Sequence, residues 1–407
     1  MRDGWSETTL GELAKFRRDR IDPLSLDSAD LLCHWSIPAL DEFGGPLWEP
    51  AGKIGSHKFR VKENAVVFSL LNPRIPRFAL VTGGDDVVCS TEFAVMQPTD
   101  LVHETFLLLL ASSNVFQKVV GSLASGTTKS RERVKPSDLE GVSINLPPLE
   151  EQKRIVDVVV SVDVYIDALQ QQADLARTAR NAVLHELLSA GGDDWTETIV
   201  SALLSRSIGG VWGTEPGTDQ EEVTVVRSTE FTKSGILNFA TGVPRSIRTS
   251  QLSSRALAEG DILLEKSGGG PEQPVGRVVY VQSDIPPRFV CSNFIQLLTP
   301  VQKKVLPKFL FMVMWMWHSE NKTLEYQAQT TGIRNLRTPD YLEQVISLPP
   351  LAEQNRIVEI VSSMDDVIQS TEQAVTDAKN LRSGLLSDLL SGEHEIPESY
   401  DVFVGAA

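Results

Sequence analysis

Arginines and lysines in short loops are the residues of this chain best suited to contact a ligand. Arg74 and Arg77 flank a turn that is restricted by Pro73 and Pro76. A guanidinium at such a turn can reach a guanine edge or a backbone phosphate, because its fork of N–H donors matches both. The alternative is a solvated turn or an ion pair with an aspartate. The residue types leave both interpretations open.

A second basic loop surrounds Gly126 and has a counterpart later in the chain. Hydroxyls, main-chain N–H groups and cations together are typical of a site for nucleic-acid phosphates. The candidate contacts in the first loop are Thr127, Thr128, Lys129 and Arg131, with Arg133 and Lys135 just beyond. Those in the second are Thr330, Thr331, Arg334 and Arg337. The alternative is a charged loop that is merely solvated.

A glycine-rich loop at residues 266–277 offers a third candidate site. Three consecutive glycines let the backbone approach a ligand closely. No Gly-Lys-Ser/Thr follows them, so we do not expect a nucleotide-binding P-loop. We predict a hairpin tip near DNA, with Lys266, Ser267, Gly268, Gly269, Gln273 and Arg277 as contacts. Lys58 is a further candidate, although it belongs to a basic cluster with Lys53, Arg60 and Lys62 for which surface solvation is the simpler explanation.

Catalytic and metal-binding patterns are hard to find. Asn72-Pro73 is followed by Arg rather than by the Pro-aromatic pair of an amino-methyltransferase, and Pro339-Asp340 lacks the acid-x-Lys continuation of a nuclease. The six histidines show no metal-ligand spacing. We therefore expect no cofactor or metal in this chain and place active sites in partner chains.

Length and composition indicate a folded protein of two to three domains. The chain has 407 residues, 41% of them hydrophobic, and no apolar run reaches the roughly 20 residues of a membrane span. Three cysteines at no metal-ligand spacing and a start without an apolar leader predict a cytoplasmic protein. The net charge of −16 lies mostly in the helical repeats and the tail, which leaves the globular segments nearly neutral. Long-range attraction to DNA is therefore expected to be weak.

A tandem duplication organises the chain. The segment Leu146–Val156 recurs as Leu348–Val358, and the match continues to Leu-Leu-Ser at 187–189 and 389–391. Shorter matches between the globular segments are Cys89-Ser90 with Cys291-Ser292 and Leu139-Glu140 with Leu342-Glu343. We predict domains at 1–145 and 191–347, long helices at 146–190 and 348–392, and an acidic, mobile tail at 393–407.

The fold class follows from apolar residues spaced three and four apart in both long segments. The first seam runs from Ile155 through Val158 or Val159 to Ile166 and Ala173, and the second from Ile357 through Ile360 or Val361 to Leu381 and Leu389. Each apolar seam must be buried against another surface, and the simplest such surface is the seam of the other long helix. We predict an α+β protein in which two similar α/β domains are separated by two long helices packed as an antiparallel coiled coil. The globular segments would then lie at opposite ends of a rod, related by a pseudo-two-fold axis.

Within the first domain we expect a strand entering a helix at Trp5–Leu13 and strands at Ala65–Leu70, Phe78–Val81 and Val87–Met96. A helix is predicted over Thr105–Val120.

The repeated Leu-Pro-Pro-Leu-x-Glu-Gln-x-Arg-Ile-Val blocks, the helices ending in Leu-Leu-Ser and the loop at 267–277 resemble the DNA-specificity subunit of Type I restriction-modification systems. Ser36–Ala39 and Ser69–Arg77 look like parts of its target-recognition domains. The resemblance implies a non-catalytic subunit that reads a bipartite, asymmetric sequence in double-stranded DNA. It also implies docking to two methyltransferase subunits and to restriction/translocase subunits, which would use S-adenosylmethionine, ATP and Mg for adenine-N6 methylation and ATP-dependent cleavage.

The helix starts suggest where partners dock. Their repeated residues are Glu151, Gln152 and Arg154 in the first copy and Glu353, Gln354 and Arg356 in the second. The alternative is that the glutamates are first-turn carboxylates favoured by the helix dipole. For the whole chain, the rival functions are a two-fold scaffold that joins two enzyme subunits without reading DNA, and a self-contained nuclease, which the missing motifs make remote.

Overall fold

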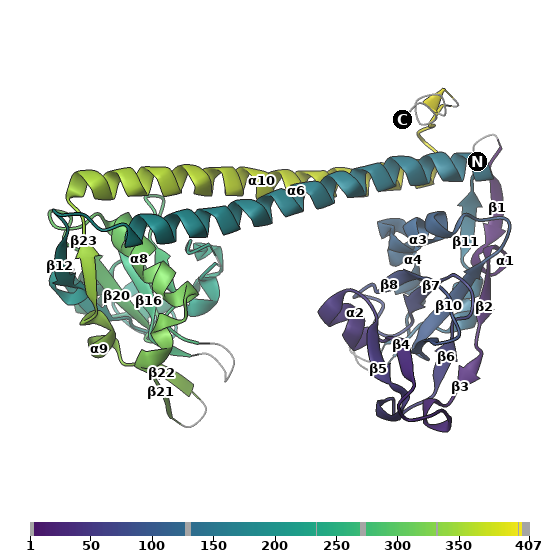
Figure 1. Ribbon diagram of the computed structural model, residues 1–407, viewed down its shortest axis with the longest axis horizontal. Helices are drawn as coiled ribbons and strands as arrows, with labels where there is room; N and C mark the ends of the chain where they lie inside the picture. Colours follow the sequence, from purple (N-terminus) through teal and green to yellow (C-terminus); the bar gives the residue numbers. More distant parts are fainter. Residues whose placement is uncertain are drawn as a thin grey trace. The chain divides into compact units, whose positions relative to one another are not determined.

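The protein divides into two compact units. The computed structural model describes residues 4–126, 132–232, 234–268, 274–330, 333–397 and 399–400, with only the backbone of 329–330. Unit 1 comprises Met1–Gln171 and Glu372–Ala407, and unit 2 comprises Gln172–Thr371. Each unit holds one globular domain and one half of each long helix, α6 (Leu149–Ser189) and α10 (Leu351–Ser391) (Figure 1).

The globular part of unit 1 is built on two sheets. A four-stranded antiparallel sheet has the order β2-β10-β7-β8, and a five-stranded mixed sheet has the order β3-β6-β9-β4-β5, in which β4 and β9 are parallel. The strands are β1 (Ser6–Thr9), β2 (Ala14–Arg17), β3 (Arg20–Ile21), β4 (Leu31–Trp35), β5 (Leu47–Pro50), β6 (Lys58–Arg60), β7 (Ala65–Ser69), β8 (Phe78–Val81), β9 (Val87–Ser90), β10 (Phe93–Pro98) and β11 (Ser143–Leu146). The short helices are α1 (Leu10–Leu13), α2 (Ile37–Phe43), α3 (Glu104–Ser112), α4 (Asn114–Leu123) and α5 (Pro136–Glu140).

The central strand β7 is apolar throughout because both of its faces are buried. Successive side chains of a strand point to opposite faces. Val66 and Phe68 accordingly pack toward α3, α4 and the long helices, whereas Ala65 and Val67 pack toward the second sheet. Helices α3 and α4 therefore lie between this sheet and the helix pair (Figure 1).

Unit 2 repeats this plan. Its four-stranded sheet β13-β20-β16-β18 matches β2-β10-β7-β8, and its parallel pair β14–β19 matches β4–β9. The strands are β12 (Thr196–Ile199), β13 (Leu204–Gly209), β14 (Glu221–Val226), β15 (Val243–Ile247), β16 (Ile262–Glu265), β17 (Ser267–Gly268), β18 (Val278–Tyr280), β19 (Phe289–Cys291), β20 (Ile295–Pro300), β21 (Gln327–Thr330), β22 (Ile333–Leu336) and β23 (Val345–Leu348). The helices are α7 (Thr249–Arg255), α8 (Pro307–Ser319) and α9 (Thr338–Leu342). The shared strand order confirms the tandem repeat.

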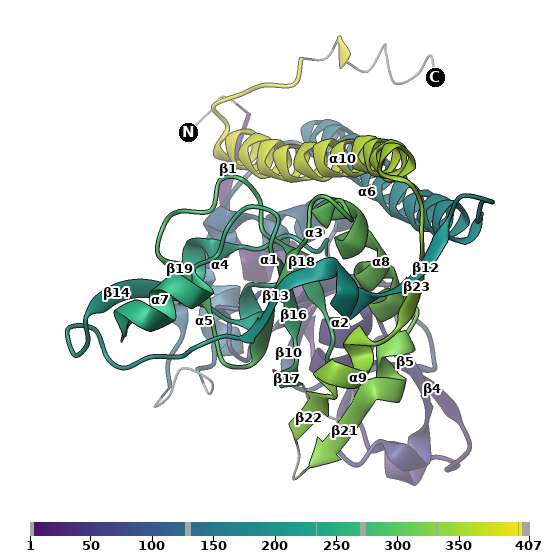
Figure 2. The same ribbon diagram turned by 90° about the vertical axis from the view of Figure 1, so that its left-hand side faces the viewer.

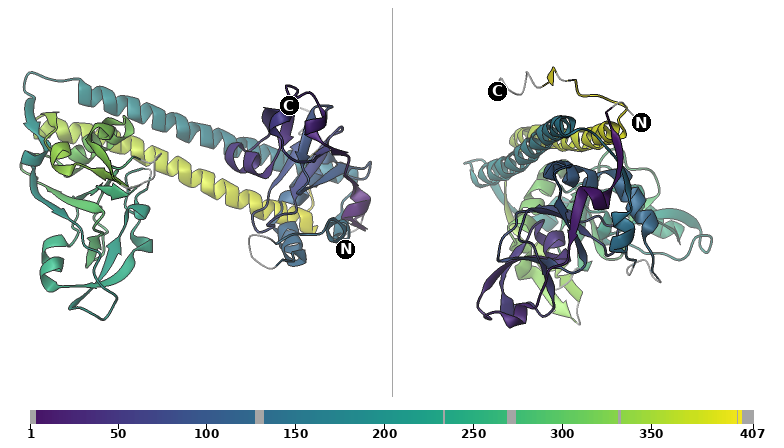
Figure 3. Two further views of the ribbon diagram at one scale, coloured as in Figure 1. Left: turned by 90° about the horizontal axis from the view of Figure 1, so that it is seen from below. Right: turned by 90° about the vertical axis from the view of Figure 1, so that its right-hand side faces the viewer.

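The long helices confirm the predicted antiparallel packing. Each has 41 residues, and within each unit the two lie side by side (Figure 3). Asp163 of α6 binds Arg382 of α10 in unit 1, and Arg180 of α6 binds Asp365 of α10 at 2.9 Å in unit 2. The two ion pairs are equivalent under the repeat, because Asp365 follows Asp163 by 202 residues and Arg382 follows Arg180 by 202 residues. Crosswise pairing of the same two residue types is what antiparallel packing of duplicated helices requires.

The predicted seam is correct at most positions but wrong at Leu381. Val159 and Val361 are fully buried, which decides the two positions that the spacing left open. Leu381 is 68% exposed. The seam passes from Ala378 to Arg382 by a four-residue step, because Arg382 turns inward to Asp163, and Leu381 therefore points outward.

Three other predictions need correction. The helix predicted over Thr105–Val120 is broken at Ser113, whose hydroxyl donates to the Leu110 carbonyl at 2.8 Å and accepts from the Phe116 amide at 3.2 Å. The strand predicted over Val87–Met96 is two strands, β9 and β10, that belong to different sheets. The tail was expected to be mobile, but Ile396 is buried in the core of unit 1 with Leu386 and Leu389. Residues 401–407 lie outside the described part.

No single helix in the described residues has the length and apolar content of a membrane span. The bent pair α3 and α4 meets that test only when both helices are counted together.

Both units carry buried, unpaired cysteines that should be inert in the native protein. Burial raises the pKa of Cys89 in unit 1 and of Cys291 in unit 2 to about 12. Since the thiolate is the reactive form, we expect alkylation by iodoacetamide at pH 8 on the order of a thousandfold slower than for a free thiol. Mass spectrometry of timed samples, with and without urea, checks this. Rapid labelling of the folded protein would contradict it.

Candidate nucleic-acid interface

The predicted loops meet at equivalent places in the two units. In unit 1, the Val134 amide donates to the Leu70 carbonyl at 3.0 Å and the Asn72 amide donates to the Glu132 carbonyl at 2.8 Å. These bonds join the β7–β8 connection to the segment that precedes α5. We call residues 70–77, 92 and 132–134 the first loop cluster.

In unit 2, the Leu336 amide donates to the Lys266 carbonyl at 2.8 Å, and Ser267 pairs with Asn335 across β17 and β22. Figure 2 shows β21 and β22 side by side next to β17. We call residues 266–268, 277, 294 and 334–337 the second loop cluster. The turn before β10 also belongs to the first cluster, because the Glu92 carbonyl accepts from the Leu70 amide at 2.9 Å. In the same way the turn before β20 belongs to the second cluster, because the Phe294 carbonyl accepts from the Lys266 amide at 2.9 Å.

Arg77 and Arg277 occupy equivalent positions at the base of these loops. The Ser69 amide donates to the Arg77 carbonyl at 2.8 Å, and the Glu265 amide donates to the Arg277 carbonyl at 2.9 Å. Each arginine is therefore the first residue after its loop to rejoin the sheet. The sequence placed both among the candidates but did not show that they correspond.

Both arginines form bidentate hydrogen bonds with a carboxylate. Arg77 donates from Nε and Nη2 to Asp41 of α2 at 2.6 and 2.8 Å. Arg277 donates from Nε and Nη2 to Glu265 at 2.8 Å each, and from Nη2 to the Ser228 carbonyl at 3.1 Å. The hydrogen bonds from Arg77 also lower the pKa of Asp41. The aspartate partner left open by the sequence is thus present at Arg77.

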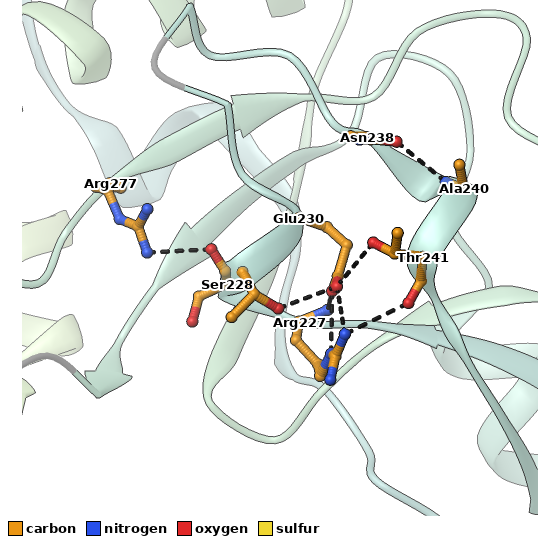
Figure 4. Close-up of polar contacts among 8 residues, drawn as sticks. Arg227, Ser228, Glu230, Asn238, Ala240, Thr241 and Arg277 are labelled. Carbon is orange, nitrogen blue, oxygen red and sulfur yellow. Dashed lines mark hydrogen bonds and ion pairs between the residues drawn. The ribbon is translucent and has the colours of Figure 1, made fainter. Parts of the chain in front are cut away.

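A buried carboxylate, Glu230, lies two residues after Ser228, whose carbonyl accepts from Arg277 (Figure 4). Glu230 is 3% exposed and accepts from the Arg227 guanidinium at 2.6 Å, from Thr229 Oγ1 at 3.0 Å and from Thr241 Oγ1 at 3.2 Å. Burial alone would raise the pKa of Glu230, but the hydrogen bonds from Arg227 and Thr229 outweigh it and lower that pKa. This network holds the segment that carries the Ser228 carbonyl, and therefore one contact of Arg277.

The loop arginines are compensated rather than free. Arg74 binds Glu132 at 2.6 Å, Arg133 binds Glu92 at 2.8 Å and Arg337 binds Asp340 at 3.0 Å. The clusters are thus oriented arginine–carboxylate pairs and not simple basic patches. Glu132 and Glu92 were not predictable as partners, because they are 58 and 41 residues from their arginines along the chain. For Asp340 the i,i+3 spacing from Arg337 was an available signal.

Other candidate residues have more internal positions. Ser267 Oγ donates to Asn335 at 2.5 Å, Lys266 Nζ lies 3.4 Å from Gln296, and Arg334 is half-buried on β22. Lys58 is 5% exposed and donates to the Ser56 carbonyl at 2.9 Å. Its ammonium faces the protein, so we no longer place it at DNA. Of the predicted contacts, Thr127, Thr128, Lys129, Arg131, Gly269, Gln273 and Thr331, and the side chain of Thr330, lie outside the described residues.

The predicted docking residues join each helix to its own domain. Gln152 is fully buried, accepts from the His103 amide at 2.8 Å and donates to the Leu101 and Pro147 carbonyls at 3.0 and 2.9 Å. Gln354 repeats this with the Leu306 amide at 2.8 Å and the Lys304 and Pro349 carbonyls at 3.5 and 2.8 Å.

The adjacent glutamates are also bonded within the chain, Glu151 being buried and Glu353 half-buried. Glu151 accepts from Trp5 Nε1 and Glu353 from Trp195 Nε1, both at 3.0 Å. Gln152, Gln354 and Glu151 are therefore buried side chains that join helix and domain, whereas docking at the half-buried Glu353 stays a prediction. Of the other two, Arg154 is half-buried and Arg356 is exposed.

Among the described residues, no three His, Cys, Asp or Glu side chains are grouped so that they could hold a metal ion.

Two copies of one α/β module, each joined to long helices and each presenting a loop cluster with oriented arginines, define a tandem recognition protein. Residues 2–175 and 230–377 match the family Methylase_S, described as the Type I restriction modification DNA specificity domain. The chain belongs to this family, and it is a DNA-recognition subunit with two specificity domains. This confirms the resemblance, and the scaffold alternative is not favoured.

Individual relatives agree with this assignment. The chain is 21% identical to the Type I restriction enzyme StySPI specificity subunit of Salmonella potsdam, over 73% of this chain and 67% of that protein. It is also 21% identical to the MjaVIII specificity subunit of Methanocaldococcus jannaschii, over 96% and 93%.

Two solved structures share the fold. One, from work on complex assembly and conformational transition of the type I R-M system, has a TM-score of 0.61 at 19% identity and is matched over 96% of this chain and 98% of that one. The other, a Type-I restriction-modification S subunit from M. genitalium, has a TM-score of 0.50 at 14% identity over 95% and 96%.

Proposed function

We propose that each loop cluster reads one half of a bipartite, asymmetric DNA site for a Type I restriction-modification complex. The observation that carries this proposal is that two equivalent clusters stand on one repeated scaffold but present different side chains. Arg77 is held by Asp41 from α2, whereas Arg277 is held by Glu265 at the end of β16, the sheet strand next to β18. Equal scaffolds with unlike contact groups suit two unlike half-sites.

The paired carboxylates favour base reading over general attraction to DNA. Phosphate contacts position a protein, whereas hydrogen bonds to base edges specify sequence. A guanidinium whose rotamer is fixed by a carboxylate loses little entropy when it binds guanine O6 and N7. The carboxylate also repels phosphates, so a compensated pair contributes little to nonspecific affinity. This agrees with a chain of net charge −16.

The remaining functions belong, in this proposal, to other chains. Two methyltransferase subunits would supply S-adenosylmethionine and transfer the methyl group to adenine N6. Restriction/translocase subunits would use ATP and Mg. This chain contributes the geometry of recognition and has no catalytic step of its own.

The test exchanges one globular segment at a time. Residues 191–347 would be replaced by the equivalent segment of another family member and co-expressed with the partner subunits, and methylated adenines would be mapped by long-read sequencing. We expect one half of the methylated site to change and the other half to stay. The reciprocal exchange of residues 1–145 is the matched control and should change the opposite half. An unchanged site in both hybrids would favour the scaffold and refute the proposal.

A further inference from the structure

A hollow in unit 1 is lined by cations that the loop clusters do not include. It has a volume of about 330 Å³ and lies between the four-stranded and the five-stranded sheets. Cavities of this size can hold a small ligand. Its charged lining is Arg17, Arg60 and Lys62 against Asp19 and Glu63, completed by Val61, Ala65, Val95 and Gln97.

The two arginines of this hollow lack carboxylate partners in the described part of the chain. Arg60 is half-buried, and its guanidinium has no hydrogen bond or ion pair there. Arg17 donates only to the neutral amide of Gln97. Lys62 is 3.7 Å from Asp19 in an exposed pair, and Glu63 binds Gln97. Most arginines of the described residues bind a carboxylate, as Arg18 binds Glu140 and Arg74 binds Glu132, whereas the two arginines of this hollow do not.

The equivalent row of the sheet in unit 2 carries an additional carboxylate. Across the sheet of unit 1, Lys15 pairs with Gln97, and the next residue in the register beside Gln97 is Ala65. The same row in unit 2 is Arg206, Thr299 and Asp261. An aspartate in unit 2 therefore takes the position of Ala65 in unit 1.

Asp261 acts as a built-in anion in unit 2. It is 1% exposed and accepts from Arg206 Nη2 at 3.1 Å, from Thr299 Oγ1 at 2.5 Å and from the Ala258 amide at 2.9 Å. Ala65 supplies no such carboxylate. The cation that Asp261 neutralises, Arg206, corresponds to Lys15, which does not line the hollow. The comparison therefore shows that the lining position Ala65 lacks the carboxylate that unit 2 has, while Arg17 and Arg60 are cations of unit 1.

We propose that the hollow of unit 1 binds a phosphate group, with Arg17 and Arg60 as its main ligands and Lys62 at its rim. Arginine is favoured for phosphate because several N–H donors can contact its oxygens at once. The group can come from the DNA backbone or from a free phosphate compound. The first source rests on the proposed function and would make unit 1 alone anchor the duplex outside the loop cluster.

The first experiment measures inorganic phosphate binding to the full chain by ³¹P NMR titration. We expect binding to weaken about tenfold or more in Arg60→Gln and in Arg17→Gln, because each removes a charge-assisted contact. Ala65→Asp should abolish binding, because it adds a carboxylate to the lining of the hollow. Arg18→Gln is the matched control, since exposed Arg18 pairs with Glu140 and does not line the hollow. It should bind phosphate like the parent chain.

The second experiment measures the salt dependence of DNA binding by the complex assembled with its partners. If the phosphate belongs to the DNA backbone, the magnitude of the negative slope of log K against log salt should decrease by about one in Arg60→Gln but not in Arg18→Gln. Weaker phosphate binding with an unchanged slope identifies a free phosphate compound and supports the pocket. No phosphate binding by the parent chain together with an unchanged slope overturns the inference. If the phosphate inference fails but the complex still methylates a specific sequence, the proposed function stands. If the parent complex shows no sequence-specific methylation, the proposed function fails, and the phosphate inference is judged by the first experiment alone.

Discussion

Replacing Gln152 by leucine is expected to destabilise unit 1 by about 3 kcal/mol. The fully buried amide satisfies the His103 amide and the Leu101 and Pro147 carbonyls, which tie the start of α6 to the globular domain. Leucine fills nearly the same space but leaves these groups unpaired, and each buried unsatisfied group costs about 1–3 kcal/mol. The side chain therefore matters for its hydrogen bonds rather than for its volume.

Urea titration with thiol labelling can locate this effect. Cys89 reports on unit 1 and Cys291 on unit 2, because both are fully buried when folded. Gln152→Leu should move the labelling midpoint of Cys89 to lower urea and leave that of Cys291 in place. Gln354→Leu should do the opposite, since Gln354 repeats the joint in unit 2.

Exposed Gln172 of α6 provides the control, and its replacement by leucine should change stability by no more than about 0.5 kcal/mol. Equal shifts at both cysteines in Gln152→Leu would contradict a joint that acts within one unit.

Neutralising Asp41 should raise affinity for random DNA and at the same time reduce discrimination between sites. Asp41 holds Arg77 through two hydrogen bonds and places a negative charge at the first loop cluster. In Asp41→Asn the guanidinium gains freedom and the repulsion of phosphates falls. We expect nonspecific binding at low salt to tighten several-fold, and discrimination against an altered half-site to drop by about 1–3 kcal/mol, the usual value of a bidentate base contact.

Binding of the assembled complex to a cognate duplex and to a duplex with one altered half-site, at several salt concentrations, measures both quantities. Arg77→Gln should lose the same discrimination but without the gain in nonspecific affinity. Asp100→Asn removes an equal charge at an exposed position with no described hydrogen bond and serves as the control. Unchanged discrimination in Asp41→Asn would show that this ion pair only stabilises the domain.

The repeated helix blocks were the part of the fold that residue patterns could predict. Period and length are local properties, so the apolar spacing in residues 146–190 and 348–392 indicated two long helices, and 41 residues form each of them. The break at Ser113 was less visible, because a serine can continue a helix or cap the next one, and packing against the sheet selects between the two. The exposure of Leu381 likewise depends on where Arg382 finds its aspartate.

The residues and their order determined that the protein is duplicated and that its helices need each other, and they predicted arginine-bearing loops as its contact groups. Only the tertiary structure decided which residues neutralise those arginines, because the partners of Arg77 and Arg74, Asp41 and Glu132, are 36 and 58 residues away along the chain. It also decided that Ala65 and Asp261 hold the same sheet position, since strand register is fixed by cross-strand pairing and not by sequence spacing. Charge compensation between residues far apart in the chain depends on their distance in space, and for that reason it could not be predicted from the order of the residues.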